Sequence, residues 1–258
     1  MSRLRAKCPD CRTYTAVALG PDYECHACGR VFGAGLVRVP RAWGTGGEEM
    51  ARAAELPLPY PEAAVVAEDS LFEQALAIAS DLPERPLVLG GCCCAHIGAV
   101  EGLVTRYGRV AVVWLDAHGD LNTPETSPSG NTWGMPFRML FESGAVDPAD
   151  AVLVGARNLD SPEETFIAES ALNVGAEGLG QALAGTEGAY VALDCDVLAA
   201  DEMAVFMPEP DGIPLADAEA FLVEVRRRTT LLGAGLSGLR PDPANAAPLA
   251  RLCAALGL

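Results

Sequence analysis

Three side chains that can bind a metal stand close together in the segment Asp116-Ala-His118-Gly-Asp120. Carboxylates and imidazole are ligands that proteins offer to divalent cations. The three residues alternate along the chain, so an extended backbone would point them to one side. The segment therefore predicts a metal site. The alternative is a turn in which the two aspartates cap backbone N–H groups and His118 is a buried core residue.

A second pair of acids repeats this pattern. Asp194 and Asp196 follow the apolar run 188–193, much as Asp116 follows the largely apolar run 109–115. Apolar runs of this length are typical of strands that are covered on both faces of a parallel sheet. Two strand ends that both terminate in alternating acids favour one shared metal site over two separate caps.

Four of the nine cysteines predict a site of another kind. They form two C-x-x-C pairs separated by thirteen residues: Cys8 and Cys11, then Cys25 and Cys28. Two such pairs indicate a zinc ribbon, in which four thiolates surround a structural ion. Gly29 follows the second pair and suits the positive φ that a tight turn around a metal needs. Residues 1–33 hold too few apolar side chains to fold without an ion.

The remainder of the chain alternates between strand and helix patterns. This alternation predicts an α/β fold, a doubly wound parallel sheet with helices on both faces, whose sites form at the carboxyl ends of the strands. We expect the ribbon to occupy residues 1–35 and the α/β domain residues 36–258. A helix that opens at Ser70 is expected to present one apolar face, made of Phe72, Ala75, Leu76, Ala79 and Leu82.

The composition excludes several functions. A net charge of −17 argues against binding to nucleic acid or to anionic membranes. No apolar run reaches the roughly 18 residues that span a bilayer, and polar sequence follows the N-terminal methionine where a signal peptide would be apolar. We therefore expect a cytoplasmic protein.

Taken together, the motifs resemble the ureohydrolase superfamily, which includes arginase, agmatinase, guanidinobutyrase and formiminoglutamase. The resemblance covers about residues 36–258 and leaves the ribbon outside. It rests on five segments: Gly90-Gly91, 116–124, 129–131, 194–196 and 208–212. The resemblance implies a three-layer α/β fold, a homo-oligomer, and hydrolysis of a linear C–N bond by a hydroxide that bridges two Mn²⁺ ions.

The resemblance also implies a role for each metal ligand. Asp116 and Asp194 would bridge the two ions. Asp120 would bind one ion, and His118 and Asp196 would bind the other.

One departure from the family pattern concerns a ligand. After the two glycines the family has Asp-His-Ser, whereas this chain has Cys92-Cys93-Cys94, which puts Cys93 at the ligand position. A thiolate is softer than imidazole and favours Zn²⁺ or Fe²⁺ over Mn²⁺. His96 could serve instead only if the turn were rearranged.

Two departures concern the substrate. Trp133 stands where the family has a histidine that shuttles protons or contacts the substrate, and Arg240 aligns with a glutamate that receives the guanidinium. An arginine there would attract an anionic group. The alternative is that Arg240 pairs with a neighbouring acid such as Glu209 or Asp242.

The sequence therefore predicts a metal-dependent hydrolase that acts on a modified guanidino, ureido, formimino or amide compound carrying an anionic group. Asp120, Asn131 and Arg240 are the expected catalytic residues, and Asn122 and Asn131 would orient the substrate. A site with a single ion is an intermediate possibility. The alternative function is an arginase-like pseudoenzyme that serves as a binding or regulatory subunit, with the ribbon as its contact with a protein partner.

Overall fold

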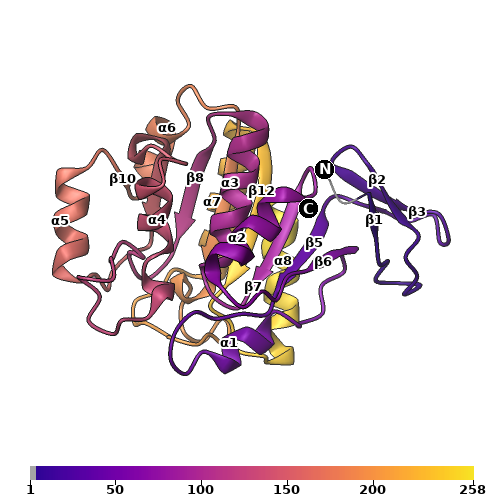
Figure 1. The fold of residues 1–258 in the computed structure, drawn as a ribbon, viewed down its shortest axis with the longest axis horizontal. Helices are drawn as coiled ribbons and strands as arrows, with labels where there is room; N and C mark the ends of the chain where they lie inside the picture. Colours follow the sequence, from indigo (N-terminus) through magenta and orange to yellow (C-terminus); the bar gives the residue numbers. More distant parts are fainter. Residues whose placement is uncertain (1–3) are drawn as a thin grey trace.

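A parallel sheet of eight strands forms the centre of the protein in the computed structural model, which describes residues 4–258 (Figure 1). The strand order is β10-β9-β8-β11-β12-β7-β5-β6, and every neighbouring pair is parallel. The predicted doubly wound α/β fold is confirmed. The strands are β5 (Gly35–Val39), β6 (Glu62–Val65), β7 (Pro86–Gly90), β8 (Ala111–Leu115), β9 (Ala151–Val154), β10 (Asn173–Val174), β11 (Ala189–Asp194) and β12 (Leu231–Ser237).

Helices cover both faces of this sheet, as the apolar character of its strands requires. Along β8, Val112 and Trp114 pack into one core with α2, α3 and α4, while Val113 and Leu115 pack into the other core with α6, α7 and α8. The helices are α1 (Glu48–Ala53), α2 (Leu71–Ser80), α3 (Ala95–Tyr107), α4 (Pro136–Glu142), α5 (Ser161–Glu169), α6 (Leu179–Ala182), α7 (Leu215–Arg228) and α8 (Ala246–Ala255).

The face that α2 turns inward differs from the expected one. Ser70 does cap this helix, because its hydroxyl accepts a hydrogen bond from the N–H of Glu73. However, Phe72 is 77% exposed and Leu76 is 57% exposed. The helix packs against α3 through Ala75 and its neighbours, because two glycines of α3 leave room for its backbone. The close packing of α2 against α3 therefore determines which face of α2 is buried. The large apolar side chains of Phe72 and Leu76 lie outside this contact.

A smaller antiparallel sheet of four strands carries the cysteine pairs, at the right of Figure 1. Its strands are β1 (Arg5–Ala6), β2 (Ala16–Leu19), β3 (Asp22–Cys25) and β4 (Val31–Phe32). Lys7 exchanges two backbone hydrogen bonds of 2.9 Å with Glu62 of β6. Since β6 is the edge strand of the large sheet, the small sheet protects part of an edge that could otherwise pair with another chain. Residues 1–3 of the expected ribbon lie outside the described residues.

Among residues 4–258, no helix has the length and apolar character needed to cross a membrane.

Candidate metal centre

Two adjacent strands bring the acidic segments together. β8 and β11 pair in parallel, with Leu115 opposite Leu193, so Asp116 and Asp194 lie side by side where the strands end. Asp194 is also opposite Ser237, the last residue of β12. The carboxyl ends of parallel strands are where α/β proteins place their sites.

The backbone after each strand is a turn and not the extended segment that the alternating pattern predicts. Asp120 has a φ of +52°, in the left-handed region that aspartate tolerates better than most residues. The carboxylate of Asp116 accepts a hydrogen bond of 2.8 Å from the N–H of His118. Asp194 accepts one of 3.0 Å from the N–H of Asp196. The capping role is therefore present, and the same turns gather the side chains into one cluster.

Two groups of possible ligands share Asp116. Cys93, Asp116 and Asp120 form one group, and Asp116, His118 and Asp196 form the other. Within each group the ligand atoms lie within 4.8 Å of one another. The Nδ1 atom of His118 is 3.1 Å from Asp196 and 3.4 Å from Asp116. This arrangement has the form of two adjacent cation sites joined by one carboxylate.

Asp194 adjoins the first group. Its Oδ2 atom lies 3.1 Å from the Sγ of Cys93, while Asp116 Oδ2 lies 3.9 Å from the same sulfur. The structure thus brings all six ligands expected from the sequence to one place.

The cluster crowds four buried carboxyl groups together, and a cation would stabilise their charged form. Without one, burial raises the pKa of Asp194 to about 7 and that of Asp196 to about 6. The Asp120 carboxyl is buried as well, and its Oδ2 has no hydrogen-bond partner within residues 4–258. Burial opposes the charge of His118, but Asp116 and Asp196 outweigh it and raise its pKa to about 12. Crowded buried carboxylates with an unsatisfied oxygen fit a divalent ion.

Cys93, and not His96, faces the acids. Burial, and after it the charges of the nearby aspartates, raises the pKa of the Cys93 thiol well above its usual value. His96 is fully buried behind it, with Nε2 at 3.1 Å from the hydroxyl of Ser237 and Nδ1 at 3.0 Å from that of Tyr190. Both ring nitrogens of His96 are engaged, so the thiol of Cys93, and not the imidazole of His96, lies against the aspartates.

A cavity of about 240 Å³ opens beside the cluster. Asn122 lines it, and its amide donates to Asp160 and accepts from Thr126. Trp133 lines it too, so no histidine is present at that place. The other lining residues are His118, Asp120, Ser127, Pro128, Ser129, Gly134, Asn158, Asp160, Glu163 and Met207.

Two residues expected to take part in catalysis lie elsewhere. Asn131 does not line this cavity, and its side-chain oxygen accepts a hydrogen bond of 2.8 Å from the N–H of Thr45. The side chain of Arg240 is 52% exposed and pairs with Glu49 at 3.5 Å. That partner differs from the two acids that the sequence suggested, Glu209 and Asp242. Since β12 ends at Ser237, this serine is the residue that the strand brings to the cluster.

The sequence analysis missed Ser237 and Asn158, and it named Glu209 only as a possible partner of Arg240. Ser237 has its hydroxyl 3.0 Å from the sulfur of Cys93. The carboxylate of Glu209 lies 3.3 Å from His118 Nε2 and accepts from the amide of Asn158. No local pattern marks these side chains, because the end of β12 and two loops, all remote in sequence, supply them.

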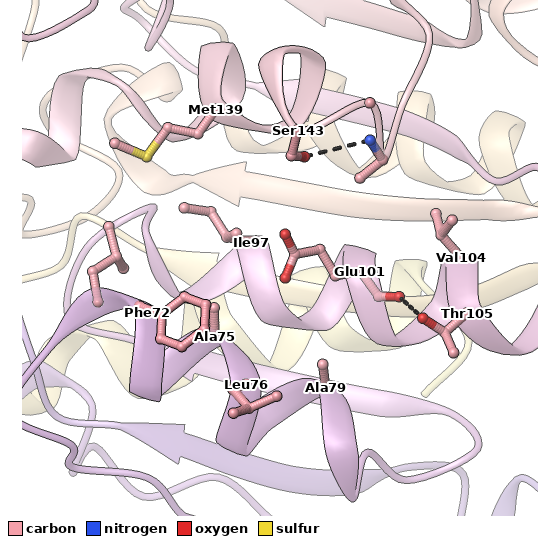
Figure 2. A pocket seen from close by; sticks show the side chains of 13 residues that line it. Phe72, Ala75, Leu76, Ala79, Ile97, Glu101, Val104, Thr105, Met139 and Ser143 are labelled. Carbon is pink, nitrogen blue, oxygen red and sulfur yellow. Dashed lines mark hydrogen bonds between the residues drawn. The ribbon is translucent and has the colours of Figure 1, made fainter.

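A larger cavity is not the site. It holds about 660 Å³ between α2, α3 and α4, and Figure 2 shows Phe72, Leu76 and Met139 around it. Its one ionisable lining residue is Glu101, so it offers no set of metal ligands or paired acids. The chemistry of the residues, and not the cavity volume, identifies the site.

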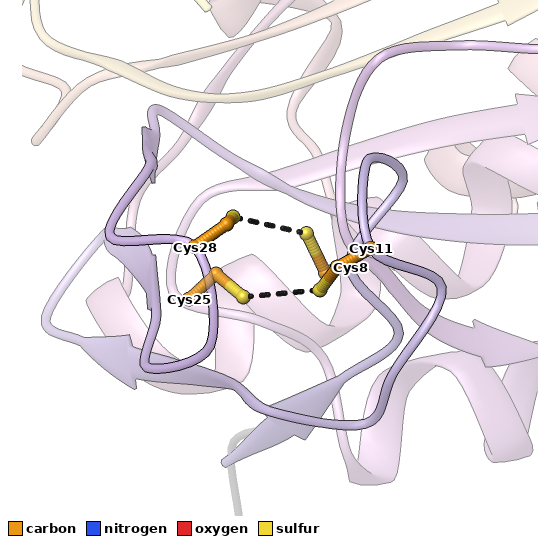
Figure 3. A group of neighbouring side chains, drawn as sticks. All are labelled: Cys8, Cys11, Cys25 and Cys28. Carbon is orange, nitrogen blue, oxygen red and sulfur yellow. Dashed lines mark hydrogen bonds between the residues drawn. The ribbon is translucent and has the colours of Figure 1, made fainter.

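The four ribbon cysteines form a separate group (Figure 3). Their sulfurs lie 3.8 Å apart for Cys8 and Cys28 and 3.5 Å apart for Cys11 and Cys25. A tetrahedral zinc ion, with Zn–S bonds of about 2.3 Å, would separate them by roughly 3.8 Å. Gly29 has the expected positive φ, +74°. The group therefore fits a structural zinc ion.

The fold and this cluster define an α/β protein with an acidic site at the strand ends, and comparison with known proteins gives its family. A model described as "Arginase family" matches residues 49–257, and the chain belongs to the arginase family. The arginase of Staphylococcus aureus strain MRSA252 is 46% identical over 92 residues, which are 32% of this chain and 30% of that protein. The arginase of Bacillus subtilis strain 168 is 43% identical over 101 residues, 34% of each chain. Matches to these curated relatives thus span about a third of their length.

Solved structures extend the likeness to most of the chain. The crystal structure of arginase from Bacillus subtilis superposes with a TM-score of 0.73 at 23% identity, covering 86% of this chain and 96% of that one. Formimidoylglutamase from Bacillus subtilis superposes with a TM-score of 0.67 at 14% identity, covering 87% of each chain. At these identities the likeness establishes the fold.

Proposed function

We propose that this protein is a metal-dependent hydrolase that cleaves a linear C–N bond in a small molecule. The observation that carries the proposal is the pair of ligand groups that share Asp116 at the ends of β8 and β11. Membership of the arginase family supports the same chemistry. Two adjacent divalent ions held there would supply an activated water as the nucleophile at neutral pH.

Each of the two groups of possible ligands that share Asp116 would hold one ion. We assign one ion to Cys93 and Asp120 and the other to His118 and Asp196, with Asp116 shared. Asp194, at 3.1 Å from the sulfur, is proposed as the second shared carboxylate. The thiolate makes Zn²⁺ or Fe²⁺ a better fit than the Mn²⁺ that the family resemblance implies.

Asp120 is the proposed group that moves a proton. It lines the cavity and is buried, and its Oδ2 has no other hydrogen-bond partner within residues 4–258. Burial and the neighbouring acids raise the pKa of its carboxyl, and its free oxygen could accept a proton from the attacking water and pass it to the leaving amine. Trp133 cannot do so, because an indole does not titrate.

The cavity favours a neutral or cationic substrate. Its lining includes Asn122, Asn158 and Asp160 but no arginine or lysine. Arg240, which was expected to attract an anionic group, pairs with Glu49 instead. A guanidino, ureido, formimino or amide compound whose other end carries an amine or hydroxyl fits this lining better than a substrate with an anionic end.

A second candidate is a pseudoenzyme that binds metal and a partner without hydrolysis. The observation in its favour is Trp133, which lines the cavity and provides no group to transfer protons. In that case the ribbon would be the contact with a protein partner.

Metal content and hydrolysis together test the proposal. Elemental mass spectrometry of the purified protein is expected to find three ions per chain, two at the acidic cluster and one in the ribbon. A panel of guanidino, ureido, formimino and amide compounds is then assayed for released amine or ammonia. The Asp120→Asn variant should lose activity by about 10²-fold or more while Asp150→Asn, a buried acid that pairs with Arg109, keeps it. Full metal occupancy with no turnover of any compound would favour the pseudoenzyme.

A further inference from the structure

A chain of buried hydrogen bonds runs from β11 to the sulfur of Cys93. It passes from the hydroxyl of Tyr190 to His96 over 3.0 Å, from His96 to the hydroxyl of Ser237 over 3.1 Å, and from Ser237 to Cys93 over 3.0 Å. Tyr190, His96 and Ser237 have no exposed surface. The chain lies behind the metal ligands and takes no part in the proposed hydrolysis.

The buried end of this chain fixes its direction. Within residues 4–258, His96 Nδ1 is the one hydrogen-bond partner of the Tyr190 hydroxyl. If His96 donated to Tyr190, the tyrosine O–H would be buried without an acceptor, which is the costly state for a polar group. Tyr190 therefore donates to Nδ1, and the neutral ring carries its proton on Nε2. Burial lowers the pKa of His96 to about 3, in keeping with a neutral ring.

The same reasoning continues to the sulfur. Nε2–H of His96 donates to the oxygen of Ser237, so the hydroxyl hydrogen of Ser237 must point elsewhere. Among the described residues its other hydrogen-bond partner is Cys93. Ser237 thus donates to the sulfur. Such a bond stabilises a thiolate, the form in which cysteine binds a metal.

A glycine of β12, Gly235, leaves room for this chain of hydrogen bonds. A Cβ atom at Gly235 would lie 2.4 Å from His96 Nδ1 and 2.4 Å from the Tyr190 hydroxyl. A side chain there would displace the two groups that form the first hydrogen bond. Trp114 of β8 also packs against His96, with the two rings nearly perpendicular and their centroids 5.5 Å apart.

We propose that Tyr190, His96 and Ser237 are positioning residues that hold Cys93 as a metal ligand through one directed hydrogen bond to its sulfur. This inference rests on the proposed metal site and adds residues that act through a ligand without touching the substrate. Partners behind a ligand commonly change metal affinity by about 10–100-fold.

Cobalt substitution of the full chain tests the proposal, because Co²⁺ bound to a thiolate gives a charge-transfer absorption band. The band due to Cys93 is the difference between the wild-type spectrum and that of Cys93→Ser, since the ribbon thiolates contribute equally to both. Ser237→Ala is expected to shift this band and to weaken Co²⁺ binding about 10-fold or more. Tyr190→Phe should shift the band in the same direction but less, because without the tyrosine hydroxyl the ring proton is less firmly fixed on Nε2 and Ser237 donates to the sulfur in only part of the molecules.

Tyr60→Phe is the matched control, because it removes the hydroxyl of another buried tyrosine, one that contacts Cys253 away from the site. It should leave the band and the affinity unchanged. A wild-type band with no shift in Ser237→Ala overturns the hydrogen bond to the sulfur. A shift in Ser237→Ala without one in Tyr190→Phe overturns the role of Tyr190. The absence of any Cys93-dependent band would instead refute the proposed metal site, so the two failures are distinct.

Discussion

The two candidate metal sites use cysteine in different ways. In the ribbon, four thiols from two short turns meet near the protein surface, and Cys28 is exposed. At the strand ends, the buried thiol of Cys93 lies among four aspartates and a histidine that come from two other segments of the chain. The ribbon site follows from local spacing, whereas the acidic site requires the whole parallel sheet to be formed.

This difference suggests different roles for the two sites: the ribbon site would support folding, and the acidic site would support catalysis. We expect a ribbon with few apolar residues to need an ion in order to fold, so this ion would stabilise structure. The acidic site stands on a large sheet with apolar cores on both faces, and its ions would serve chemistry. Disrupting either site should therefore leave the other occupied, and the predictions below test that independence.

The largest expected effect is the loss of both ions from the acidic cluster in Asp116→Asn. Asp116 belongs to both ligand groups, and an amide is a weaker ligand than a carboxylate. We expect metal affinity at this cluster to fall at least about 100-fold, beyond what residues behind a ligand usually contribute. Elemental mass spectrometry should find the metal content reduced from three ions per chain to one.

Asp150→Asn is the control for this variant. Asp150 is also buried, but it pairs with Arg109 and belongs to neither ligand group. It should reduce thermal stability and keep three ions. Retention of two or more ions by Asp116→Asn would show that the two groups do not share this carboxylate.

Loss of the ribbon ion in Cys11→Ser is the next largest effect. Zinc binding supplies about 10–16 kcal/mol of folding free energy in small zinc modules. We therefore expect the ribbon to become sensitive to limited proteolysis while the acidic cluster keeps its two ions. Cys253→Ala, which removes a buried thiol of α8, should change neither property. A simultaneous loss of all ions in Cys11→Ser would contradict the independence of the sites.

The sequence predicted what depends on local pattern. Apolar runs that end in acids located β8 and β11, and the C-x-x-C spacing located the cysteine group. Parallel pairing then explains why Asp116 and Asp194 meet, because neighbouring strands end at the same edge. The six expected ligands come together for this reason.

Long-range packing decided what the sequence did not predict. Arg240 was placed by alignment, but β12 ends three residues earlier and brings Ser237 to the cluster. Phe72 was expected on the apolar face of its helix and is exposed, because α2 lies against glycines of α3. The residue at which a strand ends, and the distance between two packed helices, cannot be predicted from the local sequence of one segment.

The Cys93→His variant tests whether the thiolate of Cys93 sets the metal preference of the acidic cluster. Imidazole is harder than thiolate, so the variant should bind Mn²⁺ more tightly relative to Zn²⁺ than the wild type does. We expect a shift of about 10-fold in the ratio of the two affinities at the acidic cluster, measured by competition between the metals. Cys92→Ala is the control, because Cys92 belongs to neither ligand group. An unchanged ratio would mean that Cys93 does not bind the ion.

The smallest expected effect is a difference in the pH at which the two sites release metal. At the acidic cluster the pKa shifts all oppose metal binding. Asp194 and Asp196 are raised to about 7 and 6 by burial, and His118 is raised to about 12 by its acids, so each ligand favours its protonated form. In the ribbon the shifts oppose each other. A hydrogen bond from Thr15 is the main cause that lowers the pKa of Cys25 to about 6, while burial raises that of Cys8 to about 12.

Because metal binding displaces these protons, acidification should empty the acidic cluster before the ribbon. Between pH 8 and pH 5 we expect the midpoint for loss from the cluster to lie about one pH unit above that of the ribbon. Metal retained after dialysis against a weak chelator at each pH measures both midpoints, with Asp116→Asn reporting the ribbon alone. Release from the ribbon first would mean that its four thiolates hold their ion less firmly than the buried carboxylates do, and would reverse the assignment of the ribbon as the structural site.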